Sequence, residues 1–240
     1  MTTNTSLGKL YLIPVTMGES DPMDVLPQTV KRTIELIDHY IVENEKTARK
    51  SIKGVLPEKK QSELVLFALN KHTDAKEHLS FIQPLLAGKN MGLMSEAGCP
   101  GVADPGAVIV KLAHEKGIQV IPLVGPSSIL LAMMASGMNG QSFTFNGYLP
   151  IDKGEKKSAL KNIEKLSFDK NQSQIFIETP YRNNKLLEDI LSALQPNTHL
   201  CIAADITLPT EYIKTLRVAD WKKTKVDLHN RPTIFIIHKF

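Results

Sequence analysis

The residues best suited to bind a ligand lie between Met91 and Gly106, in the stretch MGLMSEAGCPGVADPG. Its first four residues form an apolar run typical of a buried strand, and the rest are small, acidic or helix-breaking residues typical of a loop. Gly98 permits backbone conformations that other residues avoid, so the main chain there can approach a ligand closely. The carboxylate of Glu96 can accept hydrogen bonds from a hydroxyl or an amino group. The stretch predicts a ligand-binding loop, although a plain tight connection between a strand and a helix would use the same residues.

Three further loops follow predicted strands in the first half of the chain, at residues 14–24, 43–47 and 125–128. Because the carboxyl ends of parallel strands meet at one edge of a sheet, we expect these loops to converge with the loop at 95–105. Glu43 begins the second of them. Ser127 and Ser128 open the helix after the third, where a serine either caps the helix or binds a ligand at its N-terminus; both interpretations stay open. The four loops predict a ligand site at this edge of the sheet, and the alternative of plain tight connections stays open.

Charged residues follow two predicted strands in the second half. Glu178 and Arg182 lie in ETPYRN, where the arginine could clamp a phosphate or a carboxylate. Glu211 ends the segment DITLPTE. Each of these is equally typical of a solvated surface charge. A lysine-rich helix could contact an RNA backbone or simply face water; its lysines are Lys153, Lys156, Lys157, Lys161 and Lys165.

The elements that must position these residues alternate in the first half of the chain. Short apolar runs predict five buried strands, at residues 9–14, 40–42, 64–69, 91–94 and 119–123. Amphipathic segments predict helices at residues 25–37, 47–52, 73–86, 107–116 and 129–136. Asp24 and Thr73 are the expected N-caps of the first and third of these helices. The alternation predicts a parallel sheet with helices on both faces.

The pattern changes after a turn-rich break at GMNGQ. Strands are expected at residues 142–149, 174–178, 198–204, 212–215 and 233–238, and helices at 154–166 and 183–194. Several of these strands follow one another without a crossover helix, which predicts a mixed sheet. We therefore expect two domains, an N-terminal α/β domain of residues 1–139 and a C-terminal mixed α/β domain of residues 140–240.

The composition is that of an ordinary globular protein, with 42% hydrophobic and 22% charged residues and a net charge of +4. The excess of positive charge favours anionic partners without naming one. The sequence contains neither a GxGxxG fingerprint nor a P-loop, which argues against nicotinamide enzymes and nucleoside triphosphatases. Histidines and cysteines show no metal-ligand spacing, so no metal site is expected. The polar N-terminus and the lack of a long apolar run predict a cytoplasmic protein without a membrane span.

Four motifs occur in an order that resembles a known family. SEAGCPGVADPG, IPLVGPSS, FNGYLP and FIETPYRNN are similar to successive motifs of the tetrapyrrole methylase superfamily of S-adenosylmethionine-dependent methyltransferases. Within it, the chain most resembles the bacterial branch that methylates ribose 2'-hydroxyls in small-subunit ribosomal RNA. The similarity runs from about Gly8 to the C-terminus. It implies a parallel N-terminal domain, a mixed C-terminal domain, the cofactor in the cleft between them, and usually a homodimer.

The resemblance also implies which residues bind S-adenosylmethionine. In the first half these are Pro14, Ser95, Glu96, Ala97, Gly98, Val102, Ser127 and Ser128, and in the second half Glu178, Leu208 and Pro209. A ribose hydroxyl would benefit from a base, and the candidates are Glu43, Glu178 and Glu211. The implied partner is ribosomal RNA or the small ribosomal subunit.

Several segments depart from the pattern of that branch. PVTMGES stands where a TPIGN-like segment is usual, VENEKT where AEDTR is usual, and AADITLPTE where an ARELTK-like segment is usual. Glu96 replaces a typical aspartate. These changes affect the residues expected to bind the methyl acceptor more than those expected to bind the cofactor. Two alternatives for the function therefore stay open. One is a methyltransferase acting on a tetrapyrrole-like or other small molecule. The other is a binding or regulatory protein that keeps the fold without transferring methyl groups.

Overall fold

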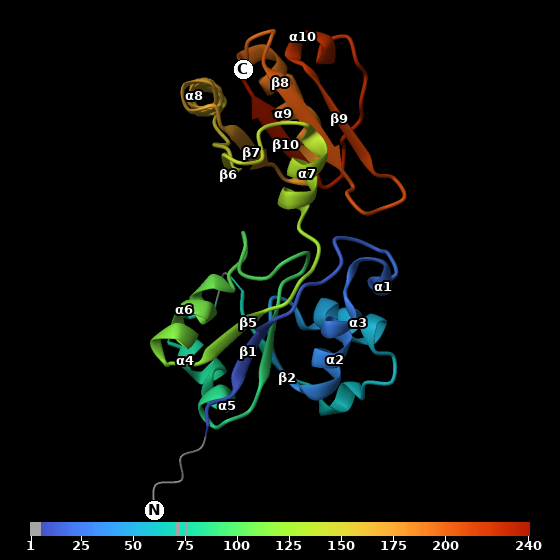
Figure 1. The fold of residues 1–240 in the computed structure, drawn as a ribbon, viewed down its shortest axis with the longest axis vertical. Coiled ribbons are helices and arrows are strands. Elements are labelled where there is room, and N and C mark those ends of the chain that lie inside the picture. Colours follow the sequence, from blue (N-terminus) through green and yellow to red (C-terminus); the bar gives the residue numbers. More distant parts are fainter. Residues whose placement is uncertain (1–5, 71–72, 75) are drawn as a thin grey trace, which may run out of the picture. The chain divides into compact units, whose positions relative to one another are not determined.

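The computed structural model describes residues 6–70, 73–74 and 76–240. The chain forms two compact units, one ending at Ser127 and the other beginning at Ser128 (Figure 1). The sequence placed this division between residues 139 and 140, twelve residues later. The difference arises because helix α7 (Ser128–Ser136) packs against strands of the second unit, where Thr215 Oγ1 donates a hydrogen bond of 2.8 Å to Ser136 O.

The first unit contains a parallel sheet of five strands in the order β3-β2-β4-β1-β5. The five short strands are β1 Lys9–Leu12, β2 His39–Val42, β3 Val65–Ala68, β4 Met91–Met94 and β5 Gln119–Pro122. Strands β2 and β4 are the most buried, whereas the edge strands β3 and β5 have no fully buried residue, although the sequence predicted that all five are buried. Leu10 lies opposite Met91 on one side of β1 and opposite Val120 on the other. The predicted parallel sheet is confirmed.

Helices cover both faces of this sheet (Figure 1). Helices α1 (Pro22–Val25), α2 (Gln28–Leu36) and α3 (Glu45–Val55) share one apolar cluster with the side chains of Ile13, Tyr40 and Met94. Helices α4 (His78–Phe81), α5 (Gln83–Leu86) and α6 (Ala107–Glu115) share the other with Leu10, Ile41 and Leu93. A short 3₁₀ turn, Gln61–Glu63, precedes β3.

Two neighbouring strands, β1 and β4, send the chain to opposite faces of the sheet. The chain continues from β1 to α1 and α2, and from β4 to α6 and then β5. Such a reversal is a topological switch point, and ligands of open α/β sheets bind just beyond the carboxyl ends of the strands that meet there. In this chain those ends are occupied by the loops that begin at Ile13 and Ser95.

Two predicted helices are each broken by proline. Residues 25–37 form α1 and α2, separated by an extended Leu26 before Pro27, because a residue before proline avoids the helical conformation. Asp21, rather than Asp24, caps α1 by accepting from Met23 N. The segment 73–86 holds the short helices α4 and α5, with Pro84 near the start of α5, and Thr73 forms a turn with Asn70 N instead of capping a helix. Part of that predicted helix, residue 75, lies outside the described residues.

The second unit contains a mixed sheet in the order β6-β7-β10-β8-β9. Its strands are β6 Phe143–Tyr148, β7 Ser173–Ile177, β8 His199–Ala204, β9 Tyr212–Arg217 and β10 Thr233–His238. Strands β6 and β7 are parallel, and the other pairs are antiparallel. One face packs with α8 (Lys153–Lys170), α9 (Asn183–Ala193) and the unpredicted α10 (Val218–Trp221) in a single apolar cluster. The predicted fold class, a parallel α/β unit followed by a mixed one, is confirmed.

Candidate active site

The loops after β1, β4 and β5 are bonded together at the switch point. Val15 N donates to Gly98 O at 3.0 Å in an isolated antiparallel bridge. Gly98 is buried with φ at +69°, and a Cβ there would lie 3.4 Å from Pro126 O. Cys99 Sγ donates to the same Pro126 oxygen at 3.3 Å. The position therefore demands glycine both for its backbone conformation and for the close approach of the β5 loop.

Pro14 connects the loop after β1 directly to the loop after β5. Its buried ring packs so tightly on Gly125 that a Cβ on the glycine would lie 2.2 Å from Pro14 Cβ and Cγ. Pro14 and Gly125 thus fix the β1 and β5 loops against each other. The sequence predicted that these loops converge, and the structure confirms it.

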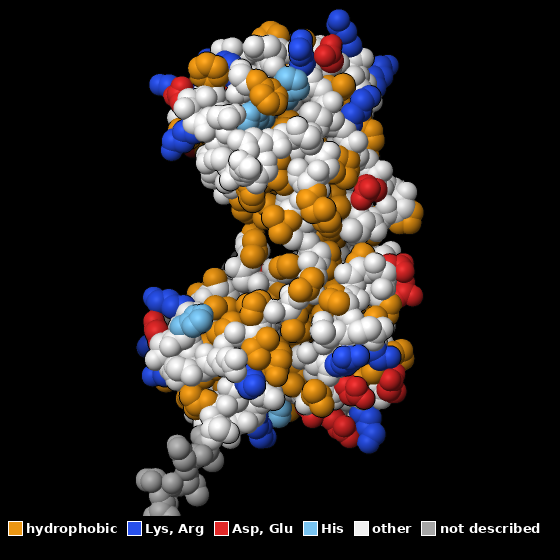
Figure 2. Space-filling view, in the orientation of Figure 1, with side chains coloured by type: hydrophobic (Ala, Val, Ile, Leu, Met, Phe, Trp, Pro, Cys, Tyr) orange, Lys and Arg blue, Asp and Glu red, His pale blue; other side chains and the backbone are white. Residues whose placement is uncertain are grey.

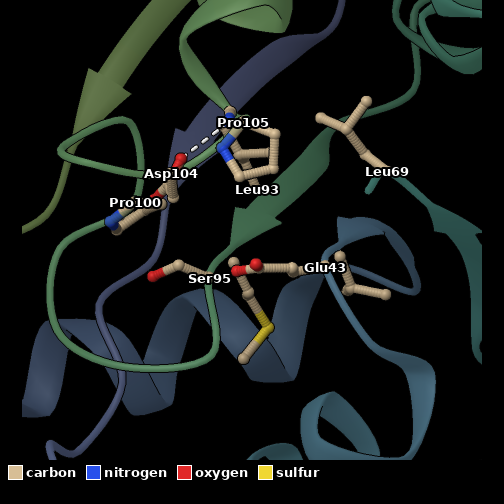
Figure 3. A pocket seen from close by; sticks show the side chains of 10 residues that line it. Glu43, Leu69, Leu93, Ser95, Pro100, Asp104 and Pro105 are labelled. Carbon is tan, nitrogen blue, oxygen red and sulfur yellow. Dashed lines mark hydrogen bonds between the residues drawn. The ribbon is translucent and has the colours of Figure 1, made fainter. Parts of the chain in front are cut away.

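Glu43 lies at the end of β2 and lines a small cavity with Ser95 and Asp104 (Figure 3). The cavity measures about 10 Å³, room for about one water molecule. In Figure 3 the carboxyl group of Glu43 points from β2 toward Ser95. Ser95 itself is half-buried and donates from Oγ to Ala97 O at 3.2 Å. A titratable carboxyl group and a hydroxyl group therefore meet beside the predicted ligand loop.

The environment of Glu43 raises the pKa of its carboxyl group. Burial raises the pKa of the Glu43 carboxyl, and the nearby charges of Glu96 and Asp104 raise it further, while a backbone hydrogen bond from Glu96 partly offsets them. The pKa of Asp104 is raised as well, because burial outweighs the hydrogen bonds from the amides of Gly106 and Gly101. Glu43 is thus a carboxyl group whose pKa is moved toward neutrality, which suits a general base.

A larger cavity opens beside the same loop. It measures about 690 Å³, within the range of roughly 300–1,000 Å³ typical of small-molecule sites. Glu96 and Ala97 form one wall, residues 16–22 after β1 form the second, and one flank of α3 from Thr47 to Gly54 forms the third. Thr47 Oγ1 makes a long hydrogen bond of 3.5 Å to Glu96 Oε1, and Lys50 pairs with Glu19 at 2.6 Å. The lining carboxylates are suited to accept from hydroxyl or amino groups of a ligand.

In the second unit, Glu178 is bound within its own turn. Its Oε1 accepts from Arg182 Nη2 at 2.7 Å and from Thr179 N at 2.7 Å. Burial acts to raise the pKa of this carboxyl, but the hydrogen bonds from Arg182 and Thr179 and the arginine charge together hold it below its usual value. Glu178 is therefore a poor base and a structural partner of Arg182. The arginine also lies 5.2 Å from the centre of the Tyr181 ring.

Leu208, Pro209 and Glu211 share a single turn after β8. Glu211 accepts from Thr207 N at 2.8 Å and so closes this turn. Asp205 accepts from Arg231 Nε at 2.7 Å and from Thr210 Oγ1 at 2.9 Å. Asn230, the residue before Arg231, donates from its backbone amide to Pro180 O. The two loops predicted to act in the second unit are thereby linked through residues 230 and 231.

The structure groups the predicted site residues into two sets. Pro14, Glu43, Ser95, Glu96, Ala97 and Gly98 lie in the first unit. Glu178, Leu208 and Glu211 belong to hydrogen-bonded turns of the second unit, and Pro209 lies within the turn that holds Leu208 and Glu211. Val102 is 52% exposed on the loop before α6. Ser127 ends the first unit, and Ser128 begins α7 of the second.

Asp104 was not singled out from the sequence. It accepts from Gly101 N at 2.8 Å and from Gly106 N at 2.6 Å, and so fixes the loop that leads into α6. An aspartate followed by Pro-Gly is a common turn signal that could have revealed this role. Over the described residues, no group of three or more His, Cys, Asp or Glu side chains could hold a metal ion. In that part of the chain no helix is long and apolar enough to cross a bilayer.

The fold defines a class of protein: a two-unit α/β protein with a candidate ligand site at the switch point of its parallel sheet. Residues 9–221 match the family Tetrapyrrole (Corrin/Porphyrin) Methylases, and the chain belongs to this family. The resemblance stated from its motifs is confirmed.

Two relatives that match most of the chain carry the same name. The Escherichia coli O157:H7 protein named Ribosomal RNA small subunit methyltransferase I is 28% identical over 237 residues, 98% of this chain and 79% of the relative. The protein of that name from Vibrio cholerae is 29% identical over 88% of this chain and 69% of its own length.

Solved structures share the fold. The methyltransferase CobJ superposes with a TM-score of 0.65 at 14% identity, covering 97% of this chain and 94% of CobJ. Uroporphyrin-III C-methyl transferase from Thermus thermophilus, complexed with S-adenosyl homocysteine, gives a TM-score of 0.58 at 16% identity, with 97% and 98% covered.

Proposed function

We propose that this protein is an S-adenosylmethionine-dependent methyltransferase that methylates a ribose 2'-hydroxyl in small-subunit ribosomal RNA. The observation that carries the proposal is the meeting of Glu43, Ser95 and the loop of Glu96 to Gly98 at the switch point, in a chain of the tetrapyrrole methylase family. The names of relatives at 27–33% identity support ribosomal RNA, whereas the solved structures of CobJ and uroporphyrin-III C-methyl transferase are only 14% and 16% identical to the chain.

The residues of the first unit fit the cofactor. S-adenosylmethionine carries an ammonium group and ribose hydroxyls, and Glu96 beside the cavity of about 690 Å³ offers a carboxylate that can accept from either. Gly98 brings the main chain close, and Pro14 holds the β1 loop in place. Ser95, Ala97, Val102 and Ser127 complete the set proposed for the first unit. The family resemblance adds Ser128, Glu178, Leu208 and Pro209, which belong to the second unit.

The cofactor supplies a methyl group already activated by its sulfonium. The protein then has to hold an acceptor oxygen in line with that methyl and exclude water. Glu43 is the base we propose, because its raised pKa matches proton removal from a hydroxyl better than an ordinary carboxyl does. Glu178 and Glu211 are less suited, since both are engaged in the turns that carry them.

Two further parts of the proposal follow from the substrate and the family resemblance. A protein that modifies ribosomal RNA acts where ribosomes are made, so we propose a cytoplasmic location. The homodimer implied by the resemblance stays a prediction.

Calorimetric titration with S-adenosylmethionine and S-adenosylhomocysteine tests the cofactor site. We expect binding by the wild type and binding weaker by about tenfold or more in Gly98→Val, because the substitution strains the backbone and crowds Pro126 O. Gly117→Val is the matched control, since Gly117 has the same φ of +69° and nothing within 4 Å of its Cβ position. Absence of binding by the wild type would overturn the proposal and favour a regulatory protein of the same fold.

A further inference from the structure

The long helix α8 carries an unpaired basic stripe on one side. Its buried side chains, among them Leu160, Ile163 and Ser167, mark the face that packs on the sheet. A helix turns by about 100° per residue, so Lys161 and Lys165 lie one turn apart on an exposed side, and Phe168 follows within the next turn. Among the described residues no carboxylate lies within ion-pair distance of either lysine, including Asp169 one turn beyond Lys165. Figure 2 shows Lys and Arg side chains around the position of α8.

This stripe borders a groove of about 520 Å³. Lys161, Lys165 and Phe168 form its α8 side, and the opposite side comes from the end of α9 and from the residue after β10, with Ala193, Gln195 and Lys239. Lys239 Nζ bonds Gln195 Oε1 at 2.6 Å and lies 5.6 Å from the centre of the Phe168 ring. The ammonium group of Lys239 therefore lies near an aromatic ring that is 58% exposed, and two further lysines line the same groove.

Among the described residues that line this groove, Glu164 is the one acidic residue, and its charge does not neutralise the lysines there. Glu164 is buried, and its Oε1 accepts from Gln195 N at 2.8 Å and from the hydroxyl of Thr198. Its carboxylate is thus used to hold α8 against the loop before β8. The charged groups exposed along this groove are therefore all cationic, and they lie beside the Phe168 ring and the neutral side chain of Gln195.

We propose that this groove binds the backbone of single-stranded RNA, with a base stacked on Phe168. The inference rests on the proposed function and adds to it a docking surface formed by residues of the second unit alone. Lysines neutralise phosphates, and an exposed aromatic ring offers a stacking platform for any base. An acidic polypeptide would be attracted by the lysines but has no base to stack on the exposed ring, so the pairing of the two features favours RNA.

Fluorescence anisotropy with a labelled single-stranded oligoribonucleotide of about 16 nucleotides tests this surface. We expect Lys161→Glu/Lys165→Glu to weaken binding by at least about tenfold and to lower the slope of log affinity against log salt by about 1.4, the value for two lost phosphate contacts. Phe168→Ala should weaken binding by about fivefold or more with little change in slope. The matched control is Lys222→Glu/Lys223→Glu, which makes the same charge change at exposed lysines following α10.

Equal effects of the groove variant and the control on affinity and slope would overturn the proposal. The proposal would also be overturned if the lysine variant lost affinity while Phe168→Ala had no effect. That result would show that the groove binds anions of any kind through charge alone. S-adenosylhomocysteine binding is measured in the same variants and should not change. If the wild type binds the cofactor and methylates RNA while the groove variants bind RNA normally, the groove inference fails and the proposed function stands. If no cofactor is bound, the proposed function fails whatever the RNA data show.

Discussion

At the scale of single residues, the site depends on one glycine and one carboxyl group. Gly98 could be selected from the sequence because a glycine between a strand and a helix suggests an unusual backbone conformation, and the φ of +69° shows that it has one. Glu43 could be listed as a base but not preferred over Glu178 or Glu211. Glu43 is preferred because burial and the charges of Glu96 and Asp104 raise its pKa. These two carboxylates lie far from Glu43 in the sequence, so their proximity becomes visible only in the structure.

Glu43→Gln should lower kcat for methyl transfer by about 10²- to 10⁴-fold, the usual contribution of a general base. Because the pKa of Glu43 is raised above its ordinary value of 4.5, the wild-type rate should fall as pH drops through that raised value. The variant should lose this acidic limb. Steady-state rates measured across pH check both statements.

Glu45→Gln serves as the control, since Glu45 is exposed in the first turn of α3. An unchanged pH profile in Glu43→Gln would contradict the assignment of Glu43 as the base.

At the scale of elements, most strands and several helices follow from the local sequence. The buried runs before the loops at Ile13 and Ser95 were identified as strands because apolar residues follow one another there without polar interruption. The helices at 25–37 and 73–86 were predicted as continuous because their apolar spacing is helical, yet Pro27 and Pro84 interrupt them. The pairing of Glu178 with Arg182 was open to prediction from their spacing of four residues. The contact of Pro14 with Gly125 was not, because it depends on strand order.

Asp104→Ala should loosen the loop between β4 and α6. Two backbone amides, those of Gly101 and Gly106, would lose their acceptor, which should lower the free energy of unfolding by about 1–3 kcal/mol. Urea denaturation measures the change. Asp169→Ala, at an exposed position of α8, should have almost no effect. Equal stability of the two variants would show that Asp104 does not fix the loop.

At the scale of the whole molecule, the chain divides where its packing changes rather than where its composition changes. The sequence suggested a boundary after residue 139 because GMNGQ is rich in turn-forming residues. Helix α7 instead buries Ala132, Met133 and Ser136 in the second unit. An apolar helix gives no sign, in one sequence, of which sheet it covers.

A fragment of residues 128–240 should therefore fold on its own, and a fragment of residues 140–240 should not. The shorter fragment lacks α7 and exposes the face of β9 and β10 that this helix covers. Far-UV circular dichroism and urea denaturation distinguish them, since we expect a cooperative transition only for the longer fragment. Equal cooperativity in both would restore the boundary at 139.

The most direct test of the central claim is methyl transfer from labelled S-adenosylmethionine to small-subunit ribosomal RNA taken from cells that lack this protein. We predict label in the RNA, recovered in dinucleotides that resist alkali because a 2'-O-methyl group blocks cleavage at the adjoining phosphate. The transfer should be strong with the wild type and nearly absent with Glu43→Gln. A protein that binds S-adenosylhomocysteine yet leaves the RNA unlabelled, or places the label only at alkali-sensitive positions, would contradict the account.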